Sequence, residues 1–178
     1  MEKRKEPEKS VTVSFSIPER LKSELEAECA RNHTTLSSLV VQLMSRHVTY
    51  DKMMEHFGGV HVGKRIFTLM LRTLEPRTME VLGKSLGSSR VQESFAFMNI
   101  EPNMNNLITN HFGPLAAYSG WYRMTNLVEG RDRNLILEHD LGPSWSAFLK
   151  GFYGAMIESL IGEMPSIDVE EGLVVIHY

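Results

Sequence analysis

The sequence has little of several features that mark particular classes of protein. Its 178 residues include one cysteine, Cys29, so no disulfide can form within the chain, which is typical of a reducing cytosol. No apolar run approaches the roughly 18 residues that a membrane-spanning helix needs. The opening residues, MEKRKEPEKS, lack the apolar centre of a signal peptide. We therefore expect a cytoplasmic protein that has no contact with a membrane.

An excess of charge is also missing, since the formal net charge is -3. This total does not by itself favour a partner of either charge. The sequence lacks a Gly-x-Ser-x-Gly elbow, a phosphate-binding loop, a His-Glu-x-x-His motif and a dinucleotide fingerprint. The run Glu138-His139-Asp140 does not replace them, because consecutive strand residues point to opposite faces. We expect neither an enzyme nor a bound cofactor.

The first informative pattern is the segment VTVSFSIP at residues 11–18, in which apolar residues alternate with hydroxyl residues. A period of two predicts a strand with one apolar and one hydroxyl face. The apolar face would carry Val11, Val13, Phe15 and Ile17. The hydroxyl face would carry Thr12, Ser14 and Ser16. Pro18 ends this strand and suits the first turn of a helix. Residues 1–10, rich in charge, are expected to form a mobile arm.

Two helices are predicted after the strand, over residues 18–32 and from Thr35 to about 48. In the first, Leu21, Leu25 and Cys29 recur at intervals of four. Thr35 is a good N-cap for the second. The second helix has a core-facing stripe formed by Leu36, Leu39, Val40, Leu43 and Met44.

A strand, a helix, a turn and a helix cannot form a stable monomer. A lone strand leaves unpaired backbone groups on both edges, and two short helices provide too little core. Antiparallel pairing of the strands of two copies would reduce both defects. The hydroxyl face of the resulting ribbon would then point outward.

Residues 11–48 resemble the ribbon-helix-helix DNA-binding domain of the Arc, MetJ, CopG and NikR type. The strand VTVSFSIP, the Pro-Glu helix start and the turn NHTTLSSLV carry this resemblance. It implies a homodimer at residues 11–50 that inserts its ribbon into the major groove of double-stranded DNA. The implied base contacts are Thr12, Ser14 and Ser16. The implied phosphate contacts are Lys9, Thr35, Leu36, Ser37 and Ser38, at the strand start and at a helix N-terminus.

The rest of the chain predicts an α+β protein overall. We expect a helical connector at 51–90, with a helix that stops at Gly87, and a domain at 91–178. In that domain we expect strands at 94–98, 121–128, 134–139 and 172–177, and helices at 103–118 and 144–162. This β-α-β-β-α-β order is that of ferredoxin-like domains.

The role of the second domain stays open between oligomerisation and the sensing of a small-molecule or metal effector. His139 and His177 would be neighbours if their strands adjoin, but no local spacing supplies the ligands of a metal site. A mainly aromatic cluster indicates either an apolar pocket or plain core; its members are Trp145, Phe148, Phe152, Tyr153 and Met156, with Tyr118, Trp121 and Tyr122. Gly151 and Gly154 indicate close helix packing, for example between subunits. The alternatives to a transcriptional regulator are an antitoxin-like interaction protein and a metal-responsive repressor.

Overall fold

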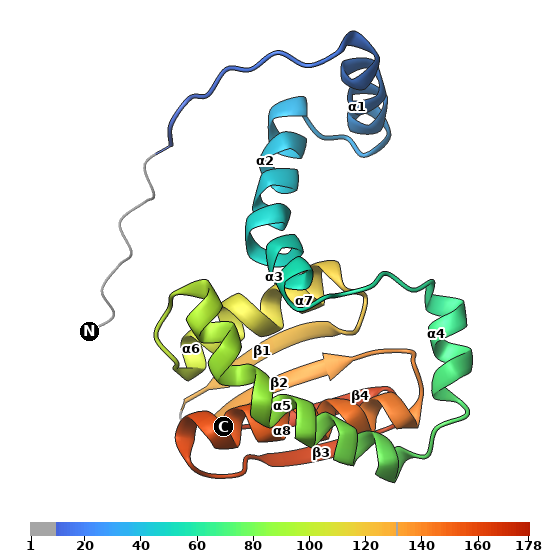
Figure 1. The fold of residues 1–178 in the computed structure, drawn as a ribbon, viewed down its shortest axis with the longest axis vertical. Coiled ribbons are helices and arrows are strands. Elements are labelled where there is room, and N and C mark those ends of the chain that lie inside the picture. Colours follow the sequence, from blue (N-terminus) through green and yellow to red (C-terminus); the bar gives the residue numbers. More distant parts are fainter. Residues whose placement is uncertain (1–9, 131) are drawn as a thin grey trace. The chain divides into compact units, whose positions relative to one another are not determined.

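The computed structural model describes residues 10–130 and 132–178 (Figure 1). The chain is α+β and divides into two compact units, Met1–Met44 and Ser45–Tyr178. Lys9 and the rest of the expected N-terminal arm, apart from Ser10, lie outside the described residues. The segment 51–90, expected to be a connector, belongs to the second unit, where its longest helix takes part in the core.

In the first unit residues 10–18 run as extended chain and form no strand. A strand needs a hydrogen-bonded partner, and residues 10–18 have none within the described part of the chain. Helix α1 spans Glu19–Arg31 and helix α2 spans Leu36–Arg46, as the sequence predicts. The backbone amide of Ser38 donates to the Thr35 hydroxyl oxygen at 3.1 Å, which confirms the predicted N-cap.

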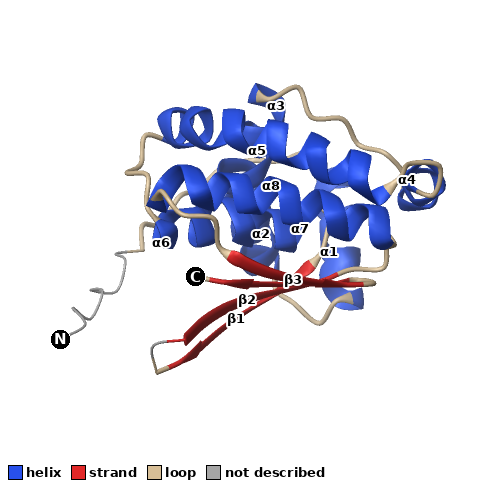
Figure 2. Cartoon of the chain, turned by 90° about the horizontal axis from the view of Figure 1, so that it is seen from below, coloured by secondary structure: helices blue, strands red, loops and turns tan. Residues whose placement is uncertain are grey.

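The second unit combines a helical layer with one sheet (Figure 2). The helix predicted at 103–118 is present as a continuous helical run over residues 104–118, which contains a π-helical segment, η2. The helical elements of the unit are η1 (His47–Asp51), α3 (Lys52–His56), α4 (Lys64–Leu71), α5 (Pro76–Met98), α6 (Met104–Leu107), η2 (Ile108–Phe112), α7 (Gly113–Tyr118) and α8 (Pro143–Ile161).

Helices α5 and α8 pack backbone to backbone at their glycines. A Cβ added at Gly87 would lie 2.1 Å from the Phe152 carbonyl oxygen, and one at Gly151 would lie 2.1 Å from that of Glu80. The prediction that Gly87 stops a helix is therefore wrong: this glycine admits the neighbouring helix, and α5 continues to Met98. Gly151 packs within the chain, so the close packing that the sequence indicated needs no second subunit.

The predicted strand at 94–98 is also wrong, because these residues form the last turns of α5. Ser94 and Phe95 are buried there, since two adjacent inward positions fit a helix that packs on one side. The helix ends at Asn99, whose φ of 51° lies in the left-handed region. Without this first strand the β-α-β-β-α-β order does not form.

The sheet has four antiparallel strands in the order β1-β2-β4-β3. Strands β1 (Arg123–Glu129) and β2 (Asp132–Glu138) form the predicted hairpin, α8 follows, and β3 (Ser166–Glu170) and β4 (Leu173–His177) form a second hairpin. The helices of the second unit lie on one side of this sheet, where α8 packs on β3 and β4, and α5 packs on α8 (Figure 2). That face contributes the fully buried Leu135, Leu137, Val174 and Ile176.

Candidate functional site

The three predicted base-contacting residues, Thr12, Ser14 and Ser16, are exposed on the extended segment. Three of the four alternate, apolar positions are exposed as well, with 79% of Val11, 70% of Val13 and 56% of Phe15 accessible, while Ile17 is half-buried. The single chain therefore leaves both faces of this segment uncovered.

The apolar positions border a groove of about 660 Å³ between the extended segment and α2. Residues of both predicted faces border it, since the segment contributes Val11, Thr12, Val13, Ser14, Phe15 and Ile17. Lys22 of α1 and Leu36, Ser37, Val40, Val41 and Met44 of α2 complete the lining. Among residues 10–44 the buried hydrophobic side chains are only those of Cys29 and Leu39. The first unit thus has more apolar surface around this groove than in its own interior.

The predicted phosphate contacts gather at the start of α2. The Thr35 hydroxyl donates to Ser38 Oγ at 3.0 Å and accepts from the Ser38 amide. Thr35 is therefore fully engaged as a cap, while the Ser38 hydroxyl proton can point outward. The amides of Leu36 and Ser37 lie in the first turn, where a helix supplies no backbone acceptor. Ser37 and Ser38 are exposed, so this terminus is accessible to an anion.

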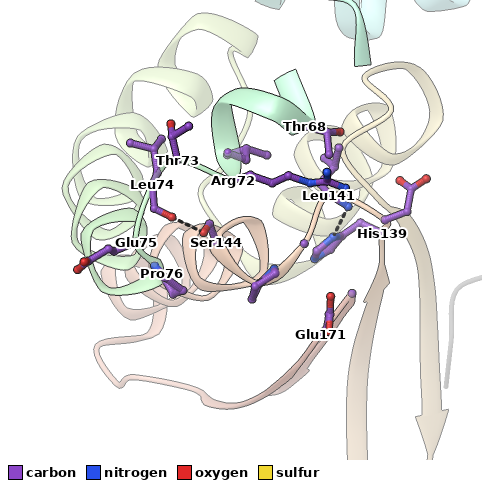
Figure 3. A pocket seen from close by; sticks show the side chains of 15 residues that line it. Thr68, Arg72, Thr73, Leu74, Glu75, Pro76, His139, Leu141, Ser144 and Glu171 are labelled. Atoms are coloured by element: carbon purple, nitrogen blue, oxygen red, sulfur yellow. Dashed lines mark hydrogen bonds between the residues drawn. The ribbon is translucent and has the colours of Figure 1, made fainter. Parts of the chain in front are cut away.

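A pocket of about 650 Å³ lies where β2 leads into α8, bordered by the chain from α4 to α5 and by the turn between β3 and β4 (Figure 3). His139 and Ser144 line it. The Ser144 hydroxyl donates to the Leu74 carbonyl at 2.6 Å. The Leu141 amide donates to His139 Nδ1 at 3.2 Å, so the proton of the neutral ring lies on Nε2.

Hydrogen bonds engage both ring nitrogens of His139. Its Nε2 donates to Ser146 Oγ at 3.0 Å, and that hydroxyl donates in turn to the Glu170 carbonyl at 3.0 Å. Ser146 is completely buried, and burial lowers the pKa of His139, an effect that Asp140 partly offsets. The hydrogen bonds of His139 and Ser146 connect the end of β2 to α8 and β3. His139 lacks the free acceptor nitrogen that would activate a nucleophile.

The two histidines considered as metal ligands are not neighbours. Asn134 pairs with His177 in the β2–β4 register and Glu138 pairs with Leu173, so His139 and His177 lie at opposite ends of these strands. His177 instead contacts the Asn134 side-chain oxygen at 2.7 Å and Asp168 at 2.9 Å. Within the described ranges, His, Cys, Asp and Glu form no group of three or more that could hold a metal ion.

The aromatic cluster that the sequence singled out is part core and part cavity wall. Tyr153 and Met156 are fully buried, and the Tyr153 hydroxyl bonds that of Tyr122. Trp121, Phe148 and Phe152 line a second cavity, of about 190 Å³. Two polar residues of this cavity, Ser94 and His111, were not predicted. No local motif marks them, since they come from separate helices.

Comparison with known proteins finds no family model that matches the chain and no matching relative among the curated proteins. No helix in residues 10–130 and 132–178 is long and apolar enough to cross a membrane.

Proposed function

We propose that the protein is a sequence-specific DNA-binding transcriptional regulator. Two copies pair residues 11–17 as an antiparallel ribbon, as in ribbon-helix-helix domains, and insert that ribbon into the major groove. The second unit provides the regulatory or oligomerisation function. This activity needs no catalytic residue.

The observation that supports this proposal most strongly is the uncovered apolar surface of the first unit. Its exposed large hydrophobic residues are Val11, Val13, Phe15, Leu21, Val41, Leu43 and Met44. Full burial of one such side chain contributes roughly 1.5–3 kcal/mol. Burial of several such side chains in each chain can offset the roughly 4–15 kcal/mol of free energy that association costs. A second copy is the natural occupant, because the same segment also has unpaired strand edges on both sides.

Pairing of the apolar faces turns the hydroxyls of Thr12, Ser14 and Ser16 outward, toward base edges. A hydroxyl can donate or accept, so these contacts discriminate bases less sharply than a bidentate arginine does. The α2 terminus supplies phosphate contacts through the Leu36 and Ser37 amides and the Ser38 hydroxyl. Lys9 is proposed to add a further phosphate contact. Thr35 acts indirectly, because its hydroxyl is engaged with Ser38.

Selection from a pool of random duplex DNA at near-physiological salt tests the proposal. Sequencing of the bound fraction is expected to give a two-fold symmetric motif, since the dimer axis imposes its symmetry on the site. Binding without a motif that disappears as salt rises would contradict sequence-specific recognition, because only phosphate attraction would remain.

A triple variant separates base reading from folding. Thr12→Ala, Ser14→Ala and Ser16→Ala together are expected to keep the dimer and to weaken the preference for the selected motif. Ser23→Ala is the matched control, because this exposed serine of α1 donates its hydroxyl to the Glu19 carbonyl of its own helix. Unchanged sequence preference in the triple variant would refute the assigned face.

The antitoxin-like alternative predicts a C-terminal part that protease cuts quickly when no toxin is bound. Residues 91–178 instead contain a four-stranded sheet and a buried helix, α8. Limited proteolysis of the free protein distinguishes the two: a stable fragment of the second unit supports the regulator.

A metal-responsive repressor, in contrast, requires that nickel, cobalt or zinc strengthen DNA binding and that chelator reverse the effect.

A further inference from the structure

The cavity of about 190 Å³ in the second unit has mostly apolar walls contributed by α3, α5, η2, α7 and α8. Phe148 and Phe152 of α8 lie stacked, with ring centroids 5.5 Å apart. Trp121 meets both rings edge-on at 6.1 and 6.2 Å. Further apolar lining comes from Met53, Met54, Phe57, Leu86 and Leu115. These walls fit a flat apolar molecule.

Two residues that line this cavity each contain a buried polar atom with no hydrogen-bond partner within the part of the chain that the structure describes. These atoms are Ser94 Oγ and His111 Nδ1, on side chains that are 1% and 5% exposed. The absence at Ser94 is unusual for a helix serine: Ser88 and Ser89 of the same helix each donate to a carbonyl one turn earlier. Buried polar groups are nearly always paired, so the unpaired ones indicate a place for a ligand atom.

A cation borders the same cavity. The Arg90 guanidinium lies 4.3 Å from the centre of the Phe57 ring and is half-buried. Arg90 and Ser94 are four residues apart on α5 and therefore lie one above the other on one face. His111 approaches from η2, and π-helical turns of this kind often occur at functional sites.

We propose that this cavity binds a small aromatic carboxylic acid. The carboxylate lies against Arg90 and accepts from the Ser94 hydroxyl, and the ring lies against the wall that Trp121, Phe148 and Phe152 form together. His111 presents its unpaired nitrogen to a polar substituent on the ring. A cavity of about 150 Å³ accepts benzene in another protein, so about 190 Å³ suits one ring with a substituent.

The second unit alone carries this site, so the proposal does not depend on DNA binding. If the protein is the regulator proposed above, the ligand is its effector. The test uses no DNA, and its failure would leave the proposed function standing.

The experiment is calorimetric titration of the intact protein with sodium benzoate and, separately, with neutral benzyl alcohol. One benzoate per chain is expected, with tighter binding than that of benzyl alcohol. The tryptophan fluorescence should change on saturation, because Trp121 lines the cavity and contacts Trp145 with ring centroids 5.0 Å apart.

Two conservative variants test the assigned contacts. Arg90→Gln is expected to weaken benzoate at least about tenfold, the scale of a lost charge-assisted hydrogen bond, and to leave benzyl alcohol nearly unchanged. Ser94→Ala should weaken benzoate less. Arg77→Gln is the control, since Arg77 is an exposed arginine of the same helix outside the cavity. Melting curves establish that each variant is folded.

Three results would overturn the proposal. One is the absence of saturable benzoate binding, and another is equal affinity for benzoate and benzyl alcohol. The third is benzoate binding that Arg90→Gln and Arg77→Gln weaken to the same extent, since general electrostatic attraction would explain it.

Discussion

Gly83 of α5 lies directly against the main chain of Phe148 in α8. A Cβ at residue 83 would fall 2.3 Å from the Phe148 carbonyl oxygen and 2.9 Å from the Phe152 amide nitrogen. Backbone atoms cannot rotate away as a side chain can, so the two helices are held at a separation that only glycine allows. The same relationship positions the two phenylalanines that form one wall of the cavity.

Gly83→Ala is expected to lower the free energy of unfolding by about 3 kcal/mol, the upper range for an overpacked core. Chemical denaturation measures this change. Ser85→Ala, an exposed substitution in the same helix, should stay within about 0.5 kcal/mol of the parent. Equal stability of the two variants would show that the helices can separate without cost.

Stability is expected to fall on acidification because of His111. Burial lowers the pKa of this imidazole from 6.5 to about 4. The folded state therefore binds fewer protons than the unfolded state between these two values. The loss begins as pH drops below 6.5 and is complete near pH 4, where it amounts to about 3 kcal/mol. Urea titrations across this range measure it.

His111→Phe removes both the titrating group and the unpaired Nδ1. At pH 7 this variant should be more stable by about 1–3 kcal/mol, the penalty of an unsatisfied buried polar group. Its stability should also vary less with pH, although His139, whose pKa burial also lowers, continues to contribute. A pH profile identical to that of the parent would exclude His111 as the main source of acid sensitivity.

Thr35→Ala is expected to destabilise α2 by about 1 kcal/mol, because the Ser38 amide loses its acceptor. Thr35→Ser keeps the hydroxyl and should behave as the parent. Hydrogen exchange at the first turn of α2 reports this difference directly. DNA affinity should fall in the alanine variant even though the Thr35 hydroxyl is not itself proposed to touch phosphate.

Phe15→Ala and Ser14→Ala should separate the two faces of the extended segment. Phe15 is proposed to lie in the dimer core, so its truncation shifts the equilibrium toward monomer by roughly 3 kcal/mol or more. Ser14→Ala should leave assembly unchanged. Sedimentation over a range of concentrations measures both, and the reverse result would mean that the faces are exchanged, as a one-residue slip requires.

Local pattern alone predicted α1, α2, α8 and the β1–β2 hairpin, but not the end of α5 or the strand β3. The spacing of Leu21, Leu25 and Cys29 predicted α1, and Thr35 correctly marked the start of α2. The turn-forming residues at 129–132 predicted the β1–β2 hairpin, and the apolar run at 172–177 predicted β4. Each of these signals depends on neighbours a few residues apart, which the sequence contains directly.

Tertiary structure decided where local signals were ambiguous. Residues 94–98 are a short apolar run, which suits either a buried strand or the end of a helix, and packing of α5 on α8 selected the helix. A glycine such as Gly87 can end a helix or allow a second helix to approach closely. Only the position of the Phe152 main chain shows that the second role applies here. The juxtaposition of Arg90, Ser94 and His111 likewise arises from the packing of separate helices. The sequence by itself determined the periodic elements, because their causes are local. The sheet order and the cavity depend on contacts between distant residues, which no local pattern specifies.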